Sequence, residues 1–482
     1  MTGRPTAAPA LTASQARPPR VLMLVANDVT DDSRVRKSAA AAAAAGCEVM
    51  VIGMSATPRS WEDRMGPVRV LRRAPLTGAG PVGRALSHAG YRSEQAAAAA
   101  LERRPLSRIV EARRRAAHGY LSSSLRGAVA ERLPAGMLGW RWIYPHFVQM
   151  ARAMGPTGDA FAPDLVHAHD FAVLEAAAGI VSRGRASGRR VAFVYDAHEY
   201  VRGYTQFSRS RLRAAVDLET EHIAAADRVL SVSPWTARRL EHDHRLAVRP
   251  DVLLNAPVLA ARALVALPGV RATLCLAPET PLLVYPGVVK PMRGLKVAVE
   301  ALPALPGVHL ALITAARGRH IEDLRALARR LGCAERLHLV PYVPTHQVSS
   351  FIADASIGLE PLLAFGNADV TLPNKVFEYI HAGLPVVASD NRSTSTLVAE
   401  LGIGEAFRIG DPADLARAVR LVLEDRSRYL RALAEPGLAE CYSWEAQAHV
   451  LAHVYVRLLE GLGPIRVPAG EQIAAILRVV SH

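Results

Sequence analysis

Short apolar runs alternate with amphipathic stretches along most of the chain. The first run, residues 20–26, is nearly all apolar, which is typical of a parallel strand buried on both faces. After a loop over residues 27–32, Ser33 is predicted to cap a helix that runs through an alanine-rich stretch and ends at Gly46. Residues 48–52 then predict a second strand. Together these elements predict one βαβ unit.

Two successive series of such units predict an α/β protein with two doubly wound, Rossmann-like domains. In the first series, further strands are expected at residues 68–71, 164–167, 190–195, 228–232 and 251–254. In the second series, strands are expected at residues 282–285, 308–313, 336–340, 355–359 and 385–388. The expected parts of the chain are a disordered tail at 1–19, a first domain at 20–255, a linker at 256–281, a second domain at 282–442, a helix capped by Ser443 at 443–462 and a tail at 463–482.

One segment of the first domain interrupts this alternation. Residues 72–141 carry thirteen arginines against four acidic residues, and a helical insertion is expected over about residues 72–155. One interpretation is an inserted subdomain with a solvated basic face. The other is a surface that contacts anionic lipid headgroups, with Trp140, Trp142 and Tyr144 at the interface. Nucleic-acid binding is a weaker third interpretation, because no recognised binding motif accompanies the charge.

Composition narrows the class of protein and its compartment. A chain of 482 residues with 50% hydrophobic and 21% charged residues predicts a globular protein of two or three domains. The four cysteines lie far apart, which argues against a disulfide framework or a zinc site and fits a reducing cytoplasm. The sequence shows neither a transmembrane stretch nor the apolar core of a signal peptide. We expect a cytoplasmic protein, with peripheral binding at the inner membrane face as the alternative that the basic segment leaves open.

The densest group of candidate functional residues lies in residues 372–389. Asn374 suits the start of a helix, and Gly383 suits its end. Lys375 then lies in the first turn, where the free N–H groups already make the helix end positive. A lysine there is unfavourable unless an anion such as a bound phosphate balances both positive charges. Glu378 follows on nearly the same face, where its carboxylate can accept hydrogen bonds from sugar hydroxyls. The alternative, which spacing alone favours, is an ordinary ion pair between Lys375 and Glu378.

A second candidate lies where the first strand of the second series ends. Gly287 permits a ligand to approach the backbone closely. Arg293 follows in a loop at the carboxyl edge of the sheet, where open α/β sheets bind ligands. Its guanidinium suits bidentate binding of a diphosphate. The alternative is a surface arginine in a turn.

Two strands of the first series end in imidazole and carboxylate groups. His169 and Asp170 follow one strand, and His198 and Glu199 follow another, so all four are expected at one edge of the sheet. The alternative for each is a hydrogen bond within a loop. No metal is expected, because no pair of these side chains has i, i+4 helical spacing. Asn27 follows the first strand without a dinucleotide or P-loop glycine fingerprint, which argues against a dehydrogenase or a kinase.

In these motifs the chain resembles the family 4 glycosyltransferases of the GT-B fold over most of residues 20–462. The most specific parts are Pro373-Asn-Lys-Val-Phe-Glu-Tyr379 and Ala382-Gly-Leu-Pro-Val-Val-Ala-Ser-Asp390, with weaker support from residues 164–170, 195–199, 293–294 and 442–445. The resemblance implies two facing Rossmann-like domains, a nucleotide-sugar donor held mainly by the second domain and an acceptor held mainly by the first. It also implies a C-terminal helix that crosses back to the first domain.

The resemblance also implies roles for single residues. Glu378 resembles the ribose-binding glutamate, Arg293 and Lys375 resemble the basic pair on the diphosphate, and His198 resembles the histidine that meets the transferred sugar. The catalytic candidates are therefore His198 and Glu378. The remaining donor-side candidates are Gly287 and Asn374, and the acceptor-side candidates are Asn27, His169, Asp170 and Glu199.

The activity expected from this resemblance is transfer of a sugar, with retention, from a nucleoside-diphosphate sugar to an acceptor hydroxyl. The acceptor is expected to be a glycan, a lipid-linked molecule of the cell envelope or a small molecule, and no metal or other cofactor is expected. Two alternatives stay open: a nucleotide-sugar epimerase of the same fold and a non-catalytic nucleotide-sugar-binding protein. Two positions depart from the family, since many members carry glutamate where this chain has Val370 and arginine where it has Val288.

Overall fold

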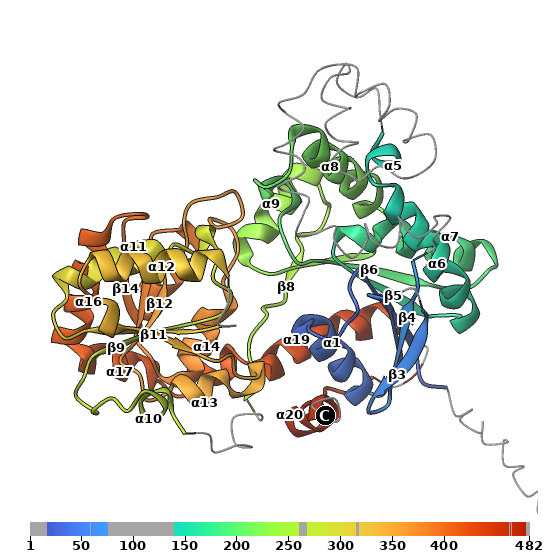
Figure 1. The fold of residues 1–482 in the computed structure, drawn as a ribbon. Helices are drawn as coiled ribbons and strands as arrows, with labels where there is room; N and C mark the ends of the chain where they lie inside the picture. The colour runs from blue at the N-terminus through green and yellow to red at the C-terminus, as the bar shows by residue number, and fades with distance from the viewer. Residues whose placement is uncertain are drawn as a thin grey trace, which may run out of the picture.

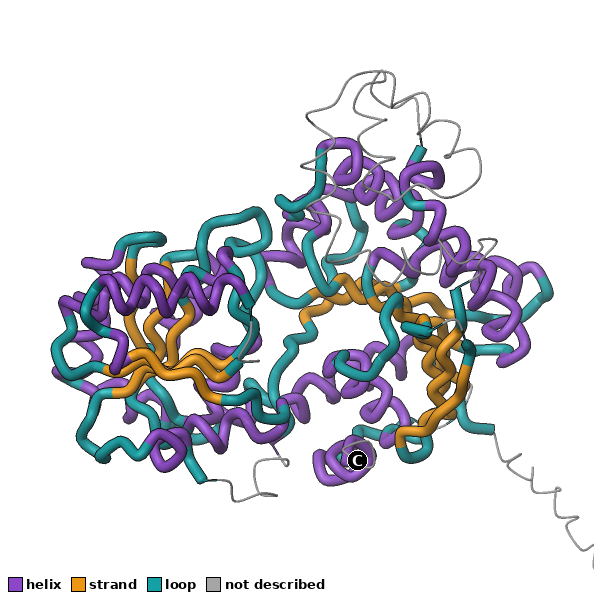
Figure 2. The backbone as a smooth tube through the Cα atoms, viewed as in Figure 1, coloured by secondary structure: helices purple, strands orange, loops and turns teal. Residues whose placement is uncertain are grey.

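The computed structural model describes residues 17–57, 59–75, 139–259, 268–314, 318–461, 463 and 465–478. Figure 1 shows two α/β domains side by side, and Figure 2 shows the two groups of strands that form their sheets, each flanked by helices. Most strand residues are buried in both sheets, which explains why the strands are nearly continuous apolar runs. Most of the arginine-rich segment, residues 76–138, lies outside the described residues.

The first sheet has eight strands in the order β3-β4-β2-β1-β5-β6-β7-β8, all parallel except the β3 and β4 pair. Its strands are β1 (Arg20–Val25), β2 (Glu48–Met54), β3 (Trp61–Met65), β4 (Val68–Arg73), β5 (Leu165–His169), β6 (Ala192–Ala197), β7 (Arg228–Ser231) and β8 (Asp251–Val252). The predicted strands of this series are all present. β3 is additional, and the sequence did not reveal it because four of its five residues are exposed.

Helices cover both faces of this sheet. One face carries α5 (Trp140–Ile143), α6 (Pro145–Phe161), α7 (Leu174–Ala186) and α8 (Arg209–Ile223), and α9 (Pro234–His244) follows β7. The other face carries α1 (Ser33–Ala44). Asp32, not Ser33, caps α1, because its carboxylate accepts a hydrogen bond from the Val35 N–H at 3.1 Å. The predicted cap was therefore wrong by one residue, since aspartate and serine cap helices about equally well.

The second sheet has six parallel strands in the order β11-β10-β9-β12-β13-β14. Its strands are β9 (Leu282–Pro286), β10 (His309–Ile313), β11 (Leu337–Val340), β12 (Ile357–Glu360), β13 (Val386–Ser389) and β14 (Gly404–Phe407). The helices of this domain are α10 (Val270–Leu274), α11 (Leu295–Ala301), α12 (Arg319–Arg330), α13 (Val348–Ile352), α14 (Asn374–Ala382), α15 (Arg392–Leu401), α16 (Pro412–Glu424), α17 (Arg426–Leu433) and α18 (Leu438–Cys441). β14 was not predicted, because three of its four residues are only partly buried.

The chain passes between the domains twice, after β8 and again at α19 (Trp444–Leu458). The N–H of Trp444 donates to the carbonyl oxygen of Pro257 at 2.7 Å, so the two passing segments are bonded together. Ser443 caps α19, as predicted, by accepting a hydrogen bond from the Ala446 N–H. α19 then packs against α1 of the first domain.

Three segments expected as tails or as a linker contain ordered contacts or a helix. α20 (Gly470–Arg478) packs on α1 through buried Ile473, so the expected tail at residues 463–482 contains a helix. Near the other end, Arg17 forms an ion pair with Asp164 at 2.7 Å, although the expected tail extended to residue 19. The linker expected at residues 256–281 contains α10. Short segments give no clear periodicity, so the sequence did not predict these elements.

The carboxyl ends of the two sheets meet at the boundary between the domains. The hydroxyls of Ser233 and Thr236, at the start of α9, both donate to the carbonyl oxygen of Val370. The Tyr200 N–H donates to Oδ1 of Asn367 at 3.1 Å. These bonds bring the first domain against the loop that precedes α14. Across the described part of the chain, none of the helices is both long and apolar enough to cross a bilayer.

Candidate functional site

Lys375 lies in the first turn of α14, at the carboxyl edge of the second sheet. Its Nζ is 3.4 Å from Oε2 of Glu360 and 4.7 Å from the ring centroid of Tyr285. A Cβ atom added to Gly287, which has a φ of +132°, would lie 3.2 Å from Cε of Lys375. The glycine therefore makes room for the lysine. Burial lowers the pKa of Lys375, but Glu360, Tyr285 and Glu378 together more than offset this, so the pKa lies above its ordinary value.

Glu360 is a functional candidate that the sequence reasoning missed. It ends β12, is 1% exposed, and neither of its carboxylate oxygens accepts a hydrogen bond from the described residues. Its partner is the Lys375 ammonium, so the ion pair that forms is not the one that helical spacing favoured between Lys375 and Glu378. A single acidic residue at the end of an apolar strand was the available signal.

Glu378 lies one turn further along α14 and is half-buried. Within the described residues its carboxylate has no hydrogen bond or ion pair. Burial raises the pKa of Glu378 to about 7, although Lys375 and Lys37 lower it. The side chain is therefore free to bond hydroxyl groups of a ligand.

We expect Glu378→Gln to gain stability relative to the wild type as the pH rises from about 4.5 to 7. The pKa of this carboxyl rises from 4.5 to about 7 on folding. In this interval the folded wild type binds more protons than the unfolded chain, so it loses stability as the pH rises. Glutamine does not ionise, and the difference in free energy of unfolding should grow to at most about 3 kcal/mol. Urea unfolding at pH 5, 6, 7 and 8 measures it, and a difference that is constant with pH would show that the pKa is not raised.

Arg293 ends the short 3₁₀ helix η4 (Pro291–Arg293) and is half-buried. The described residues offer its guanidinium no hydrogen bond or ion pair. Gly294 follows with a φ of +68°, and a Cβ atom there would lie 1.7 Å from the carbonyl oxygen of Pro361. Only glycine fits this turn, which holds Arg293 in place. Asn374 is the exposed first residue of α14.

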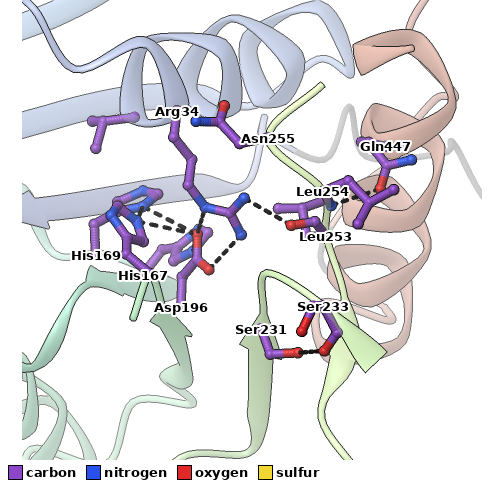
Figure 3. Close-up of polar contacts among 12 residues, drawn as sticks. Arg34, His167, His169, Asp196, Ser231, Ser233, Leu253, Leu254, Asn255 and Gln447 are labelled. Carbon is purple, nitrogen blue, oxygen red and sulfur yellow. Dashed lines mark hydrogen bonds and ion pairs between the residues drawn. The ribbon is translucent and has the colours of Figure 1, made fainter. Parts of the chain in front are cut away.

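In the first domain, Asp196 near the end of β6 lies at the centre of a cluster of histidines (Figure 3). It is fully buried and accepts hydrogen bonds from Arg34 of α1, at 2.9 Å from Nε and 2.7 Å from Nη2. The nearest ring nitrogens of His167, His169 and His198 lie 3.7, 3.4 and 3.5 Å from its Oδ2. Burial raises the pKa of Asp196, but the charges of Arg34 and His198 hold it well below its ordinary value.

His198 is the member of this cluster that reaches the surface. Its side chain is 18% exposed, whereas His167 and His169 are fully buried. Its Nε2 lies 3.2 Å from Nδ1 of His169. Burial lowers the pKa of His198, but Asp196 raises it above its ordinary value. Burial and His167 lower the pKa of His169 to about 3, so the pKa values of these two neighbouring imidazoles shift in opposite directions.

Two residues expected on the acceptor side make other contacts in the structure. His169 is 0% exposed, so it supports His198 from beneath and does not reach a ligand in this conformation. Asn27 donates to Oδ2 of Asp32 at 2.8 Å and accepts a hydrogen bond from the Val29 N–H at 2.8 Å. Its polar atoms therefore shape the loop between β1 and α1.

The candidates of the two domains lie close enough to influence one another. Asp170 and Glu199 are half-buried at the carboxyl edge of the first sheet. Burial and the charge of Asp170 raise the pKa of Glu199 to about 7, whereas Arg293 of the second domain lowers it. Burial lowers the pKa of Lys37 on α1 to about 7, whereas Glu378 on α14 raises it. We call the set of candidates from both domains the interdomain site.

The described residues contain two groups of side chains that could offer three ligands to a metal. The groups are His167 with His169 and Asp196, and Glu175 with Glu221 and His222. In the first group the guanidinium of Arg34 already binds both oxygens of the carboxylate. In the second, Arg141 binds both glutamates, at 3.2 and 2.6 Å. Because an arginine supplies the positive charge in each group, neither fits a cation.

Three residues central to these clusters were not singled out from the sequence. Asp196 is an acidic residue within an otherwise apolar strand, and Glu360 ends another. Arg34 is a charged residue on the buried side of α1. A charged residue at a position that the pattern assigns to the core was the available signal, because such a residue needs a partner.

Two family models match the chain. One, described as "Glycosyl transferases group 1", matches residues 280–425, and the other, described as "Glycosyltransferase Family 4", matches residues 109–256. A D-inositol 3-phosphate glycosyltransferase of Nocardia farcinica is 28% identical over 256 residues, which cover 49% of this chain and 54% of that protein. The chain thus spans about half the length of this relative.

Solved structures share the fold along nearly the whole chain. Sucrose-phosphate synthase from Thermosynechococcus elongatus has a TM-score of 0.65 at 16% identity, covering 92% of this chain and 99% of that one. Anabaena HepE in complex with UDP has a TM-score of 0.59 at 15% identity, covering 91% and 100%. The predicted fold, two Rossmann-like domains in the GT-B arrangement, is confirmed. The chain therefore carries one domain that matches the glycosyl transferases of group 1 and one that matches Glycosyltransferase Family 4, joined in the GT-B fold.

Proposed function

We propose that the chain transfers a sugar from a nucleoside-diphosphate sugar to an acceptor hydroxyl, with retention of configuration. The observation that carries the proposal is the distribution of charge at the interdomain site. On the side of the second domain, Arg293 has no partner among the described residues, and Lys375, which is close enough for the charge of Arg293 to influence it, has a raised pKa. On the side of the first domain, His198 lies at the surface of a buried cluster. Cations therefore face the place where a departing diphosphate would develop negative charge.

In this proposal the second domain binds the donor. Cleavage of the bond between sugar and diphosphate leaves negative charge on the diphosphate oxygens, and two cations held in place stabilise that charge without a metal. Within the described part of the chain the carboxyl group of Glu378 has no partner, which suits bonding to the two hydroxyls of a ribose. Contacts made to the nucleotide also hold the reacting carbon in place for attack.

Retention requires the acceptor oxygen to enter on the face that the diphosphate leaves. In the proposed step the bond from the sugar carbon to the diphosphate oxygen breaks, and the bond to the acceptor oxygen forms. The acceptor proton passes to a diphosphate oxygen, so charge and atoms balance. His198 is proposed to bond the transferred sugar, and closure of the two domains is proposed to exclude water, which otherwise would hydrolyse the donor.

The named relatives narrow the first substrates to test. The Nocardia protein is named for D-inositol 3-phosphate, and Anabaena HepE was solved with UDP and with UDP-glucose. We propose UDP-sugars as the first donors to test and hydroxyl-rich small molecules or glycans as the first acceptors.

A thermal-shift screen of uridine, guanosine, thymidine and adenosine diphosphates and their sugars tests the donor site. A ligand at 100 times its Kd stabilises the native state by about 2.7 kcal/mol. For domains of this size, that corresponds to roughly 5–10 °C in Tm. We expect one base to give this shift, and no shift with any of them would contradict the proposal.

Product analysis then separates the alternatives. With donor and acceptor together, we expect a glycoside with the anomeric configuration of the donor, identified by NMR. An epimerised donor formed without acceptor would favour the epimerase. Donor binding with no turnover across an acceptor panel would favour a non-catalytic binding protein.

A further inference from the structure

Arg34 and Asp196 form a buried ion pair to which the proposed reaction assigns no role. Arg34 is 3% exposed and Asp196 is 0% exposed. Two N–H groups of the guanidinium donate to the carboxylate, and a third, on Nη1, donates to the carbonyl oxygen of Leu253 at 2.7 Å (Figure 3). Leu253 follows β8 directly, in the segment that leads to the second domain. The same guanidinium therefore contacts the histidine cluster and the segment that joins the domains.

The joining segment is held from two sides. The Leu254 N–H donates to Oε1 of Gln447 on α19 at 2.9 Å. Lys37, one turn along α1 from Arg34, donates to Oδ1 of Asn255 at 2.7 Å and to the carbonyl oxygen of Ala256 at 2.6 Å. Four consecutive residues of the segment are thus bonded to helices: Arg34 and Lys37 of α1 bind three of them, and Gln447 of α19 binds the fourth. A change in the path of this segment would displace Arg34 and, with it, Asp196.

Asp196 is linked to His198 in two ways. Its Oδ2 lies 3.5 Å from Nε2 of His198, and the same Oδ2 lies 3.4 Å from Nδ1 of His169, which in turn contacts Nε2 of His198 at 3.2 Å. His167 packs on His169 with ring centroids 4.1 Å apart and is bonded to the hydroxyl of Tyr455 on α19 at 2.7 Å. The base of the cluster is thus closed by packed side chains, and His198 is left as its outer member.

We propose that Arg34 and Asp196 are positioning residues for His198, which hold its imidazole at the interdomain site and set its charge. The proposal deepens the proposed function, because it rests on His198 acting on the transferred sugar. The Asp196 carboxylate stabilises the protonated imidazole of His198. Arg34 keeps that carboxylate ionised, and its own positive charge partly counteracts the stabilisation of the imidazolium. The bond from Arg34 to Leu253 ties both to the segment between the domains.

Several charged or titratable groups face His198 from the elements around it. They are Asp196 and Glu199 at the end of β6, His167, His169 and Asp170 at the end of β5, and Arg34 and Asp32 at the start of α1. Among them Asp196 raises the pKa of His198 most strongly, and Arg34 lowers it. Removal of the Asp196 charge should therefore lower the pKa of His198, and removal of the Arg34 charge should raise it. A general loosening of the fold would not give opposite shifts.

The test is the pKa of His198, measured by NMR on the full chain with labelled histidines and assigned by comparison with His198→Gln. We expect Asp196→Asn to lower this pKa by about 1–3 units and Arg34→Gln to raise it by up to about 1 unit. A pKa that is unchanged in Asp196→Asn, or shifts of the same sign in both variants, would overturn the proposal. The measurement needs no substrate, so its outcome is independent of whether the chain transfers a sugar.

Each single substitution leaves one buried charge without its partner, which threatens folding. The variant Arg34→Gln/Asp196→Asn removes both charges and serves as the second measurement. We expect its His198 pKa below that of the wild type, because Asp196 contacts the imidazole and Arg34 does not. A wild-type pKa in this variant would overturn the proposal. Where turnover is measurable, kcat should fall in Asp196→Asn while the KM for donor stays near the wild-type value, and a matching rise in KM would instead indicate a structural role.

Discussion

Lys375→Ala is expected to lower kcat/KM for sugar transfer by about 10²–10³-fold, the usual cost of removing a group that stabilises developing negative charge. Its ammonium is charged and partly sheltered from water, and both Glu360 and Tyr285 lie close to it. Most of the loss should appear in kcat, because the charge on the diphosphate grows as the bond to the sugar breaks. Steady-state rates with a saturating acceptor and varied donor measure both constants.

Two further variants make this result specific. Lys296→Ala is the matched control, since this lysine of α11 is 72% exposed and pairs with the nearby Glu300, four residues on. We expect it to have wild-type activity. Lys375→Ala also leaves the Glu360 carboxylate buried without a partner, so Lys375→Ala/Glu360→Gln separates that cost from the loss of the cation. If this double variant regained full activity, the role of Lys375 would be to neutralise Glu360 and not to bind the diphosphate.

Arg34→Met is expected to lower the free energy of unfolding of the first domain by about 3–5 kcal/mol, because it leaves the Asp196 carboxylate buried without its counter-charge. The substitution also removes the donor to the Leu253 carbonyl. Methionine fills much of the same volume, so the effect reports lost polar contacts more than a cavity. Urea unfolding followed by circular dichroism measures it.

Arg183→Met is the comparison for this effect. Arg183 on α7 forms an ion pair with Asp159 at 2.8 Å, and the two side chains are 54% and 35% exposed. Exposed pairs of this kind contribute about 0–1 kcal/mol. Equal losses in the two variants would mean that burial does not set the value of the Arg34 pair, and the account of the histidine cluster would need revision.

The local pattern of apolar and polar residues was sufficient to predict the alternating strands and helices of both domains. The buried strands show as apolar runs, and the helices between them show as amphipathic stretches, because each element must bury one side against its neighbours. The start of α14 and its end at Gly383, which has a φ of +67°, follow from residue types with strong local preferences. The polar residues at strand ends also follow, since parallel strands bring their carboxyl ends to one edge.

The predictions of secondary structure that failed involve short or exposed segments. β3 and α20 carry few buried residues, so their periodicity is weak, and packing against β4 and α1 decides their structure. The cap of α1 moved by one residue, because Asp32 and Ser33 are both good caps and the path of the preceding loop selects between them.

The sequence alone predicts two Rossmann-like domains. It also predicts that Arg293 and His198 follow strand ends and that Lys375 and Glu378 lie in the first turns of a helix. The partners of these residues came only with the folded structure: Glu360 for Lys375, and Asp196 with Arg34 beneath His198. Arg34 and Asp196 are 162 positions apart. The periodicity of apolar residues indicates which face of a helix or strand is buried. A buried charge, in contrast, is paired with one specific group from another element. No short-range pattern encodes that choice, because it depends on how the sheets and helices are brought together.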